Sequence, residues 1–250
     1  MNNVLVLISF DDGVREDLRS AMLLEKYGLK GNFFIITSNI GRELSITDVL
    51  YLAELHEIGS HTVNHVRLLS ASLKRARTEI LESKRTLENI IGRRVTSFAY
   101  PFGAYDRATI EMVKEAGFCC ARTTDPYNLT LDANPYKLKV TLWASPNPLK
   151  LYPQLLKNCL RYMAISIFIL KPWITKRWNE LAKDLYKSIC RTSKGVFHIL
   201  VHSREIKKRS EWRMLEEVFN ILSSYAGSEN PTVSEYVKLY LHRVNAKQDG

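Results

Sequence analysis

The chain contains 250 residues, 46% of them hydrophobic, which is enough to bury roughly three quarters of its unfolded surface in one large domain. Its 36 Lys and Arg outnumber its 26 Asp and Glu, and the net charge of +10 favours an anionic partner such as a phosphate, an acidic glycan or a membrane surface, unless the chain is simply basic throughout. A zinc-ribbon protein is excluded, because the four cysteines lack the required spacing. A nucleic-acid-binding module is excluded, because basic and aromatic residues do not interleave as such binding requires.

Strands and helices are predicted to alternate along the chain. Apolar runs predict strands at residues 4–8, 31–36, 95–100, 118–123, 136–143 and 195–201. Helical spacing of apolar residues predicts helices at residues 14–27, 46–58, 72–91, 106–116, 210–225 and 232–244. Because alternating strands and helices form parallel sheets, we expect an α/β barrel and assign residues 1–250 to a single domain.

Residues 149–194 interrupt this alternation. Their apolar stretch at residues 162–170 is too short to span a bilayer. We interpret the segment as an inserted pair of packed helices. The alternative is a helix lying on a membrane surface, which is suggested by the basic residues Lys157, Arg161, Lys171, Lys176 and Arg177. No signal-peptide pattern precedes the first strand, so we expect a cytoplasmic location, with membrane association under this alternative.

Polar side chains follow several of the predicted strands. Asp11 and Asp12 end the first strand, and successive side chains of a strand point apart, so these two carboxylates are expected to have different roles. His61 and His65 are four residues apart and would share one face of a helix. Two imidazoles and one carboxylate form a metal site that leaves positions open for water and substrate.

Two further polar elements follow strands, at residues 100–103 and at His202. The ends of barrel strands at which the chain leaves the sheet meet on one rim, where the chemistry of such folds takes place. The remaining histidines are interpreted differently: His198 as a core residue bonded to the main chain, and His56 and His242 as exposed.

At these residues the sequence resembles the polysaccharide deacetylase superfamily, carbohydrate esterase family four, whose domain is a distorted (β/α)7 barrel. Residues 9–13, S-F-D-D-G, resemble the first motif, and this resemblance implies that Asp11 is the catalytic base and Asp12 a metal ligand. Residues 61–65, H-T-V-N-H, resemble the second motif and imply that His61 and His65 are the other two ligands.

Residues 98–103, F-A-Y-P-F-G, resemble the third motif. The resemblance implies that the main-chain N–H of Phe102 binds the oxyanion and that Tyr100 and Pro101 contribute to the substrate site. The commoner form of this motif carries an arginine that orients the base, where this chain has Ala99. Arg122, on the following strand, either replaces that arginine and faces the substrate site or forms an ion pair on the surface.

Residues 200–202, L-V-H, resemble the fifth motif, which implies that Leu200 lines the acetyl pocket and that His202 is the general acid. The resemblance as a whole implies a hydrolase of carbon–nitrogen bonds that removes an N-acetyl group from an amino sugar in a polysaccharide, an oligosaccharide or a glycan precursor. The ligand set favours Zn²⁺ and also accepts Co²⁺, Mn²⁺ or Fe²⁺.

Two other functions stay open. A deformylase, or another amidohydrolase acting on a lipid-linked amino sugar or a small amide, would keep the metal site and change the pocket. A non-catalytic carbohydrate-binding protein would keep the fold and lose the base or the acid, and it is disfavoured because both are present. The expected partner is a carbohydrate rather than a nucleic acid, and the sequence does not specify the oligomeric state.

Overall fold

A curled parallel sheet forms the centre of the fold. The computed structural model describes residues 4–126, 128–130, 132, 134–144 and 177–241. Within these residues eight strands pair in the order β5–β4–β3–β2–β1–β7–β6, and β8 pairs with β1 beside this path. The strands are β1 Val4–Asp12, β2 Asn32–Ile35, β3 Glu57–Ser60, β4 Ser97–Ala99, β5 Cys120–Arg122, β6 Leu142–Ala144, β7 Gly195–Val201 and β8 Ser228–Glu229. The predicted α/β class with a curled parallel sheet is confirmed.

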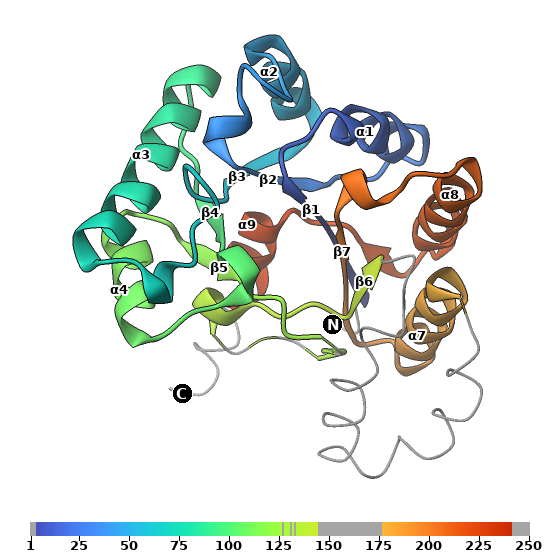
Figure 1. Cartoon of the computed structure of the whole chain (residues 1–250). Coiled ribbons are helices and arrows are strands. Elements are labelled where there is room, and N and C mark those ends of the chain that lie inside the picture. Colours follow the sequence, from blue (N-terminus) through green and yellow to red (C-terminus); the bar gives the residue numbers. More distant parts are fainter. Residues whose placement is uncertain (1–3, 127, 131, 133, 145–176, 242–250) are drawn as a thin grey trace, which may run out of the picture.

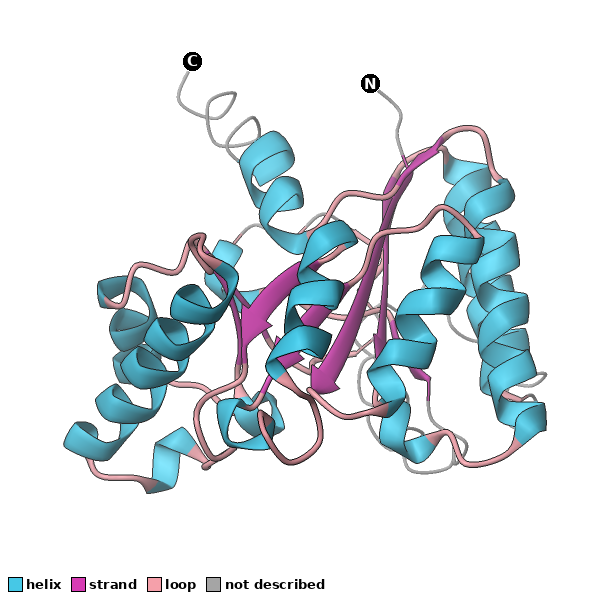
Figure 2. Ribbon diagram, turned by 90° about the horizontal axis from the view of Figure 1, so that it is seen from above, coloured by secondary structure: helices cyan, strands magenta, loops and turns pink. Residues whose placement is uncertain are grey.

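Helices surround this sheet on its outer side (Figures 1 and 2). They are α1 Glu16–Lys26, α2 Ile46–Leu55, α3 Leu73–Ile91, α4 Arg107–Glu115, α7 Trp178–Thr192, α8 Arg209–Ser224 and the short α9 Val233–Tyr236. Side-chain caps set several of their starts, since the side chains of Ser45 and Asp106 accept from the N–H groups of Asp48 and Thr109 at 3.1 and 2.8 Å. None of the helices in the described ranges is both long and apolar enough to cross a membrane.

The residues between β5 and β6 cross the open side of the sheet. The N–H of Leu138 donates to the carbonyl of Ala121 at 3.0 Å, and a few residues later Leu142 pairs with Ile199 of β7. The predicted strand at 136–143 is therefore wrong over its first half. Residues Pro135–Lys137 form a single helical turn instead, because Asn134 accepts the N–H of Tyr136 at 2.9 Å and proline has no N–H for a ladder.

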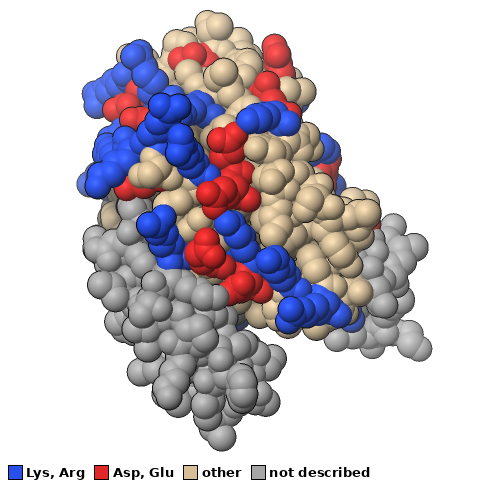
Figure 3. All heavy atoms as spheres, turned by 90° about the vertical axis from the view of Figure 1, so that its right-hand side faces the viewer, with Lys and Arg blue, Asp and Glu red and all other residues tan. Residues whose placement is uncertain are grey.

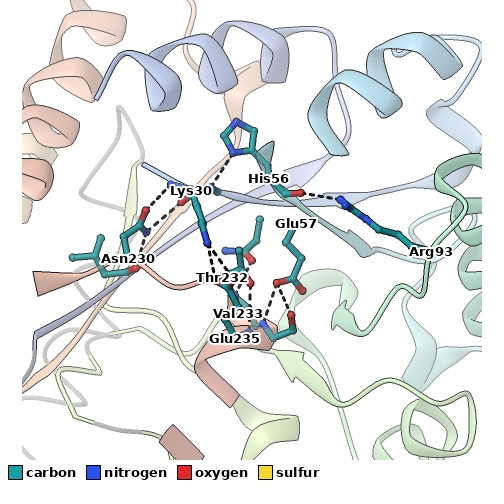
Figure 4. Close-up of polar contacts among 12 residues, drawn as sticks. Lys30, His56, Glu57, Arg93, Asn230, Thr232, Val233 and Glu235 are labelled. Carbon is teal, nitrogen blue, oxygen red and sulfur yellow. Dashed lines mark hydrogen bonds and ion pairs between the residues drawn. The ribbon is translucent and has the colours of Figure 1, made fainter. Parts of the chain in front are cut away.

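The predicted helix at 46–58 is also too long, because α2 ends at Leu55 and the following residues form β3. Pairing of Ile58 with Phe33 in the parallel ladder overrides the helical spacing of the apolar residues. His56 was predicted to be exposed and is instead 5% exposed, with its Nδ1 accepting the N–H of Gly31 at 3.3 Å (Figure 4).

The short helix α9 covers the end of the barrel at which β2 and β3 begin (Figures 1 and 4). Asn32 accepts the N–H of Val233 at 2.8 Å, and Glu57 accepts the N–H and hydroxyl of Ser234 at 3.0 and 2.9 Å. Lys30 pairs with Glu235 at 3.1 Å. This end of the barrel is closed by polar contacts, so the opposite end is the one that can admit a substrate.

Of the segment predicted as an insertion, residues 149–176 lie outside the described residues. Its last part forms α7, which buries Trp178, Leu181 and Leu185. On the face that includes α7 and α8, acidic and basic side chains intermingle (Figure 3). Lys183 pairs with Glu217 at 2.6 Å there, so part of the positive charge of this face is neutralised by nearby carboxylates.

Candidate metal centre and active site

The first strand delivers two carboxylates to the open end of the barrel. Asp11 is 2% exposed, whereas the side chain of Asp12 is 29% exposed. Asp12 has a φ of 83° and Gly13 a φ of 67°, so the chain turns sharply as β1 ends. A Cβ at Gly13 would lie 2.7 Å from the Ile35 side chain, which leaves glycine as the residue that fits. The two aspartates thus have different surroundings, in agreement with the alternation of side chains along a strand.

The two histidines of the second element meet through a turn and not on a helix face. His61 continues from β3, and Thr62 and His65 have φ values of 68° and 53°. The two imidazole centroids are 4.7 Å apart. The spacing of four residues therefore brings the rings together by a left-handed turn, which the helical interpretation missed.

Asp12, His61 and His65 fit a divalent metal ion. They can each place one ligand atom within 4.8 Å of the others. The Nδ1 of His61 shares a hydrogen bond of 2.8 Å with the carbonyl of Ala99, which makes Nδ1 the protonated nitrogen and leaves Nε2 free to bind a metal. Burial lowers the pKa of His61 to about 4, so the imidazole is neutral near pH 7, as a metal ligand must be.

Asp11 is paired with a buried arginine from β5, which is separated from β1 in the sheet by β4, β3 and β2. Arg122 is fully buried, and its Nη2 lies 2.5 and 2.6 Å from the two carboxylate oxygens of Asp11. Burial by itself would raise the pKa of Asp11, but the charge of Arg122, assisted by His61 and His202, lowers it below its usual value. The alternative of a surface ion pair for Arg122 is wrong, and Asp11 is held as a carboxylate.

His202 and Phe102 complete the group around Asp11 and Asp12. The Nε2 of His202 is 3.9 Å from a carboxylate oxygen of Asp11, and its side chain is 32% exposed. Phe102 has a φ of 59°, is 57% exposed, and has its ring centroid 4.5 Å from that of His65. The structure therefore gathers residues from the ends of β1, β3, β4, β5 and β7 at one site.

The structure buries three residues that were expected to contact the substrate. Tyr100 is fully buried, its hydroxyl donates to the carbonyl of Tyr136 at 3.3 Å, and its ring packs against Phe98 in the core. Pro101 is also buried. Leu200 is fully buried on β7 and shares a strand face with His202, which is compatible with a place beneath the acetyl group. Substrate contact by these residues stays a prediction.

His198 is a core residue as predicted. It is 1% exposed, its Nδ1 is bonded to the carbonyl of Lys139 at 2.9 Å, and its Nε2 lies 2.7 Å from the Ser9 hydroxyl. A residue that the sequence interpretation missed is Glu79 of α3, because charged residues on a long helix usually face solvent. Glu79 is 4% exposed and bonds the turn that carries His65. Glu79 is three residues after the buried Ala76 and so shares its helix face, and this spacing was the sequence signal for its burial.

Comparison with known proteins finds a family profile that matches the first half of the chain and curated relatives that match about half of it. The sequence profile of the polysaccharide deacetylase family matches residues 2–121. The Bacillus subtilis protein YxkH is 30% identical over 138 residues, which are 53% of this chain and 49% of that protein. The peptidoglycan-N-acetylglucosamine deacetylase of Bacillus cereus is 30% identical over 119 residues, which are 47% of this chain and 55% of that enzyme. The chain thus spans about half the length of these curated relatives.

Solved structures share the fold over almost the whole chain. A protein from Mycobacterium smegmatis superposes with a TM-score of 0.66 over 98% of this chain and 91% of its own, at 16% identity. The family 4 acetyl xylan esterase from Clostridium thermocellum, solved with a cobalt ion, superposes with a TM-score of 0.58 over 94% of this chain and 91% of its own, at 16% identity. At these identities the likeness establishes the barrel fold.

Proposed function

Since the chain belongs to the polysaccharide deacetylase superfamily through residues 2–121, we propose that it is a metal-dependent hydrolase that removes the N-acetyl group of an amino sugar. The substrate class is a polysaccharide, an oligosaccharide or a glycan precursor. The observation that carries the proposal is that the three candidate ligands lie beside Asp11, whose Oδ2 is 3.9 Å from the Nε2 of both His61 and His202. A binding protein would need the sugar site alone and would have no use for this acid–base pair.

The ligands, the base and the acid have separate tasks in this reaction. Asp12, His61 and His65 would hold a divalent ion, which would lower the pKa of a water molecule and polarise the acetamide carbonyl. Asp11, kept ionised by Arg122, accepts the proton of the attacking water.

His202, whose Nε2 is 3.9 Å from the Oδ2 of Asp11, then donates a proton to the departing amine. Without that donation an amide anion would have to leave, which is strongly unfavourable. The left-handed conformation of Phe102 sets the direction of its main-chain N–H, which we assign to the oxyanion. The base, the oxyanion donor and the acid thus lie at the ends of β1, β4 and β7, and the metal ligands lie at the ends of β1 and β3.

Zn²⁺ is our proposed ion, because two imidazoles and one carboxylate with open positions are typical of catalytic zinc. The same donors accept Co²⁺, Mn²⁺ and Fe²⁺. The cobalt ion in the Clostridium thermocellum esterase shows that a related fold accommodates a second metal of this group.

Contact with a membrane surface through residues 149–194 is a separate proposal, based on the basic and apolar residues of that segment. Charge attraction to anionic lipids is screened over about 8 Å at physiological salt. The parent should therefore co-sediment with anionic vesicles more weakly as salt rises, and a variant with Lys171, Lys176 and Arg177 changed to Gln should not bind. Equal binding of both proteins at every salt concentration would contradict the contact. The cytoplasmic location stays a prediction.

A panel of substrates tests the proposed reaction. The purified chain, loaded with Zn²⁺, is incubated with N-acetylglucosamine oligomers and with N-formyl analogues, and acetate and formate are measured separately. We expect acetate release that stops with a chelator and returns with Zn²⁺. Formate release alone would favour the deformylase alternative. Oligomer binding without release of either acid would show a carbohydrate-binding protein and overturn the proposal.

A further inference from the structure

Helix α3 buries a carboxylate on the face that it turns toward the barrel. Glu79 is 4% exposed, and its neighbours on this face, Ala76, Ile80 and Leu87, are apolar and buried. Burial of a carboxyl group in such surroundings is strongly unfavourable unless its oxygens are hydrogen-bonded. The partners of Glu79 therefore explain its presence.

All three hydrogen bonds of Glu79 go to the turn between the two candidate histidine ligands. Its Oε2 accepts the N–H of Val63 at 3.0 Å and the N–H of Asn64 at 2.8 Å. Its Oε1 accepts from the Asn64 side-chain amide at 2.9 Å. Glu79 is thus fixed to the two residues that precede His65, although it lies on another element.

The turn held by Glu79 has an unfavourable backbone conformation. Thr62 is β-branched and has a φ of 68°, and His65 has a φ of 53°. Non-glycine residues are strained in the left-handed region and persist there only when their surroundings impose this conformation. The amides of Thr37 and Ser38, in the helical turn that follows β2, donate to the carbonyls of Thr62 and Val63 at 3.1 and 2.9 Å, so this segment holds one side of the turn. Glu79 holds the other side through the N–H groups.

His61 and His65 depend on different supports. His61 follows β3 directly, its N–H donates to Ile35 at 3.0 Å, and its ring is oriented by Ala99. The main chain of His65 is held by the turn itself, where its N–H donates to the Thr62 hydroxyl at 3.0 Å. A relaxed turn would therefore move His65 and leave His61 in place.

We propose that Glu79 is a positioning residue for the metal site, which holds the turn of residues 62–65 so that His65 meets Asp12 and His61. The inference rests on the proposed function, because it assigns His65 to the metal. It adds a contribution of α3 to a site whose predicted residues all follow strands. Loss of a residue that orients a ligand typically weakens metal affinity by about 10- to 100-fold.

The test compares substitutions of two glutamates of the same helix. Glu79→Ala removes the acceptor, Glu79→Asp withdraws it by about one carbon–carbon bond, and Glu79→Gln keeps an oxygen for the two main-chain N–H groups. Glu88→Ala is the matched control, because Glu88 of α3 accepts the N–H of Val95 at 2.9 Å and pairs with Lys84 at 2.8 Å near the other end of the helix. Both alanine variants lose a helix carboxylate that holds a loop.

Two quantities are measured on the full chain: amide hydrogen exchange at residues 63 and 64 without metal, and the Kd for Zn²⁺ in competition with a chromogenic chelator. We expect Glu79→Ala to exchange faster at these two amides and to bind Zn²⁺ about 10- to 100-fold more weakly. Glu79→Asp should be intermediate, and Glu79→Gln should recover most of the affinity. Glu88→Ala should keep the parent Kd even if its thermal stability falls.

The outcomes separate this inference from the proposed function. A parent Kd in Glu79→Ala, or equal weakening by Glu79→Ala and Glu88→Ala, would reduce Glu79 to a structural residue and overturn the inference. If Glu79→Ala does not fold, Glu79→Asp and Glu79→Gln decide the same question. A parent chain that binds no divalent ion would overturn the metal site itself and the role of Glu79 with it. Unchanged exchange at residues 63 and 64 would overturn the inference alone.

Discussion

Replacement of Arg122 by Met should move the acidic limb of the pH–activity profile. Both Arg122 and Asp11 are buried, and the Nη2 of Arg122 lies 2.5 and 2.6 Å from the carboxylate oxygens. Two unit charges about 4 Å apart at an effective dielectric constant of about 20 attract each other by about 4 kcal/mol. Loss of this attraction in the variant raises the pKa of Asp11.

The acidic limb moves to higher pH because Arg122 favours the ionised state of Asp11. Arg122 lowers the pKa of Asp11, so the parent holds this carboxylate ionised at low pH. In Arg122→Met the carboxyl group stays protonated to higher pH and cannot accept a proton. The acidic limb of kcat/KM should therefore move to higher pH, and activity should partly recover at alkaline pH.

The assay is acetate release between pH 5 and 10 at saturating Zn²⁺, and denaturant unfolding of the same proteins. Removing one partner of a buried pair destabilises by about 3 to 5 kcal/mol, and Asp11→Asn with Arg122→Met should recover part of this loss because no charge is left unpaired. Arg93→Met is the control, because Arg93 donates to the main-chain carbonyls of Ala53 and His56 at the far end of the barrel (Figure 4). An acidic limb at the parent pH in Arg122→Met would refute the reasoning.

Three further predictions concern single residues. His61→Ala should lose the bound ion in elemental analysis, and a metal content equal to that of the parent would rule out His61 as a ligand. Asp11→Asn should keep the ion and lose turnover, because a base and not a ligand is removed; full activity of this variant would exclude that role. Burial, reinforced by Arg122, lowers the pKa of His198 to about 3, so stability should fall as the pH drops from about 6.5 towards 3, by up to about 1.4 kcal/mol per unit. His198→Gln should flatten this dependence in urea unfolding, whereas an unchanged slope would mean that other groups cause it.

Long strands and helices could be predicted from the sequence because their apolar residues repeat often enough to show the period of a strand or of a helix. The strand Gly195–Val201 and the helix Leu73–Ile91 lie at or within a residue of the predicted limits. The strand Glu57–Ser60 could not, since four residues are too few to show alternation and pairing with β2 decides their conformation. The start of the strand predicted at residue 136 is similarly a helical turn, because Pro135 and the cap formed by Asn134 favour it.

The candidate site was predictable in its residue types but not in its geometry. The spacing and order of the motifs predicted that Asp12, His61 and His65 lie together. The left-handed turn that joins the two histidines has no signature in the sequence. The pairing of Asp11 with Arg122 links residues 111 positions apart, and Ala99 at the place of the usual arginine was the sole hint of it. Glu79, which is buried, was missed because a charged residue on a long helix is usually exposed to solvent.

Titration of the metal-free chain with Zn²⁺ in the presence of an N-acetylglucosamine oligomer tests the central claim most directly. Acetate release and bound metal are measured in the same samples, with His65→Ala as the companion variant. We predict that the rate rises in proportion to bound Zn²⁺ and levels off at about one ion per chain, whereas His65→Ala stays inactive over the same range. Acetate release at the full rate in excess chelator, or a rate independent of bound metal, would contradict the assignment of this site as a metal-dependent deacetylase centre.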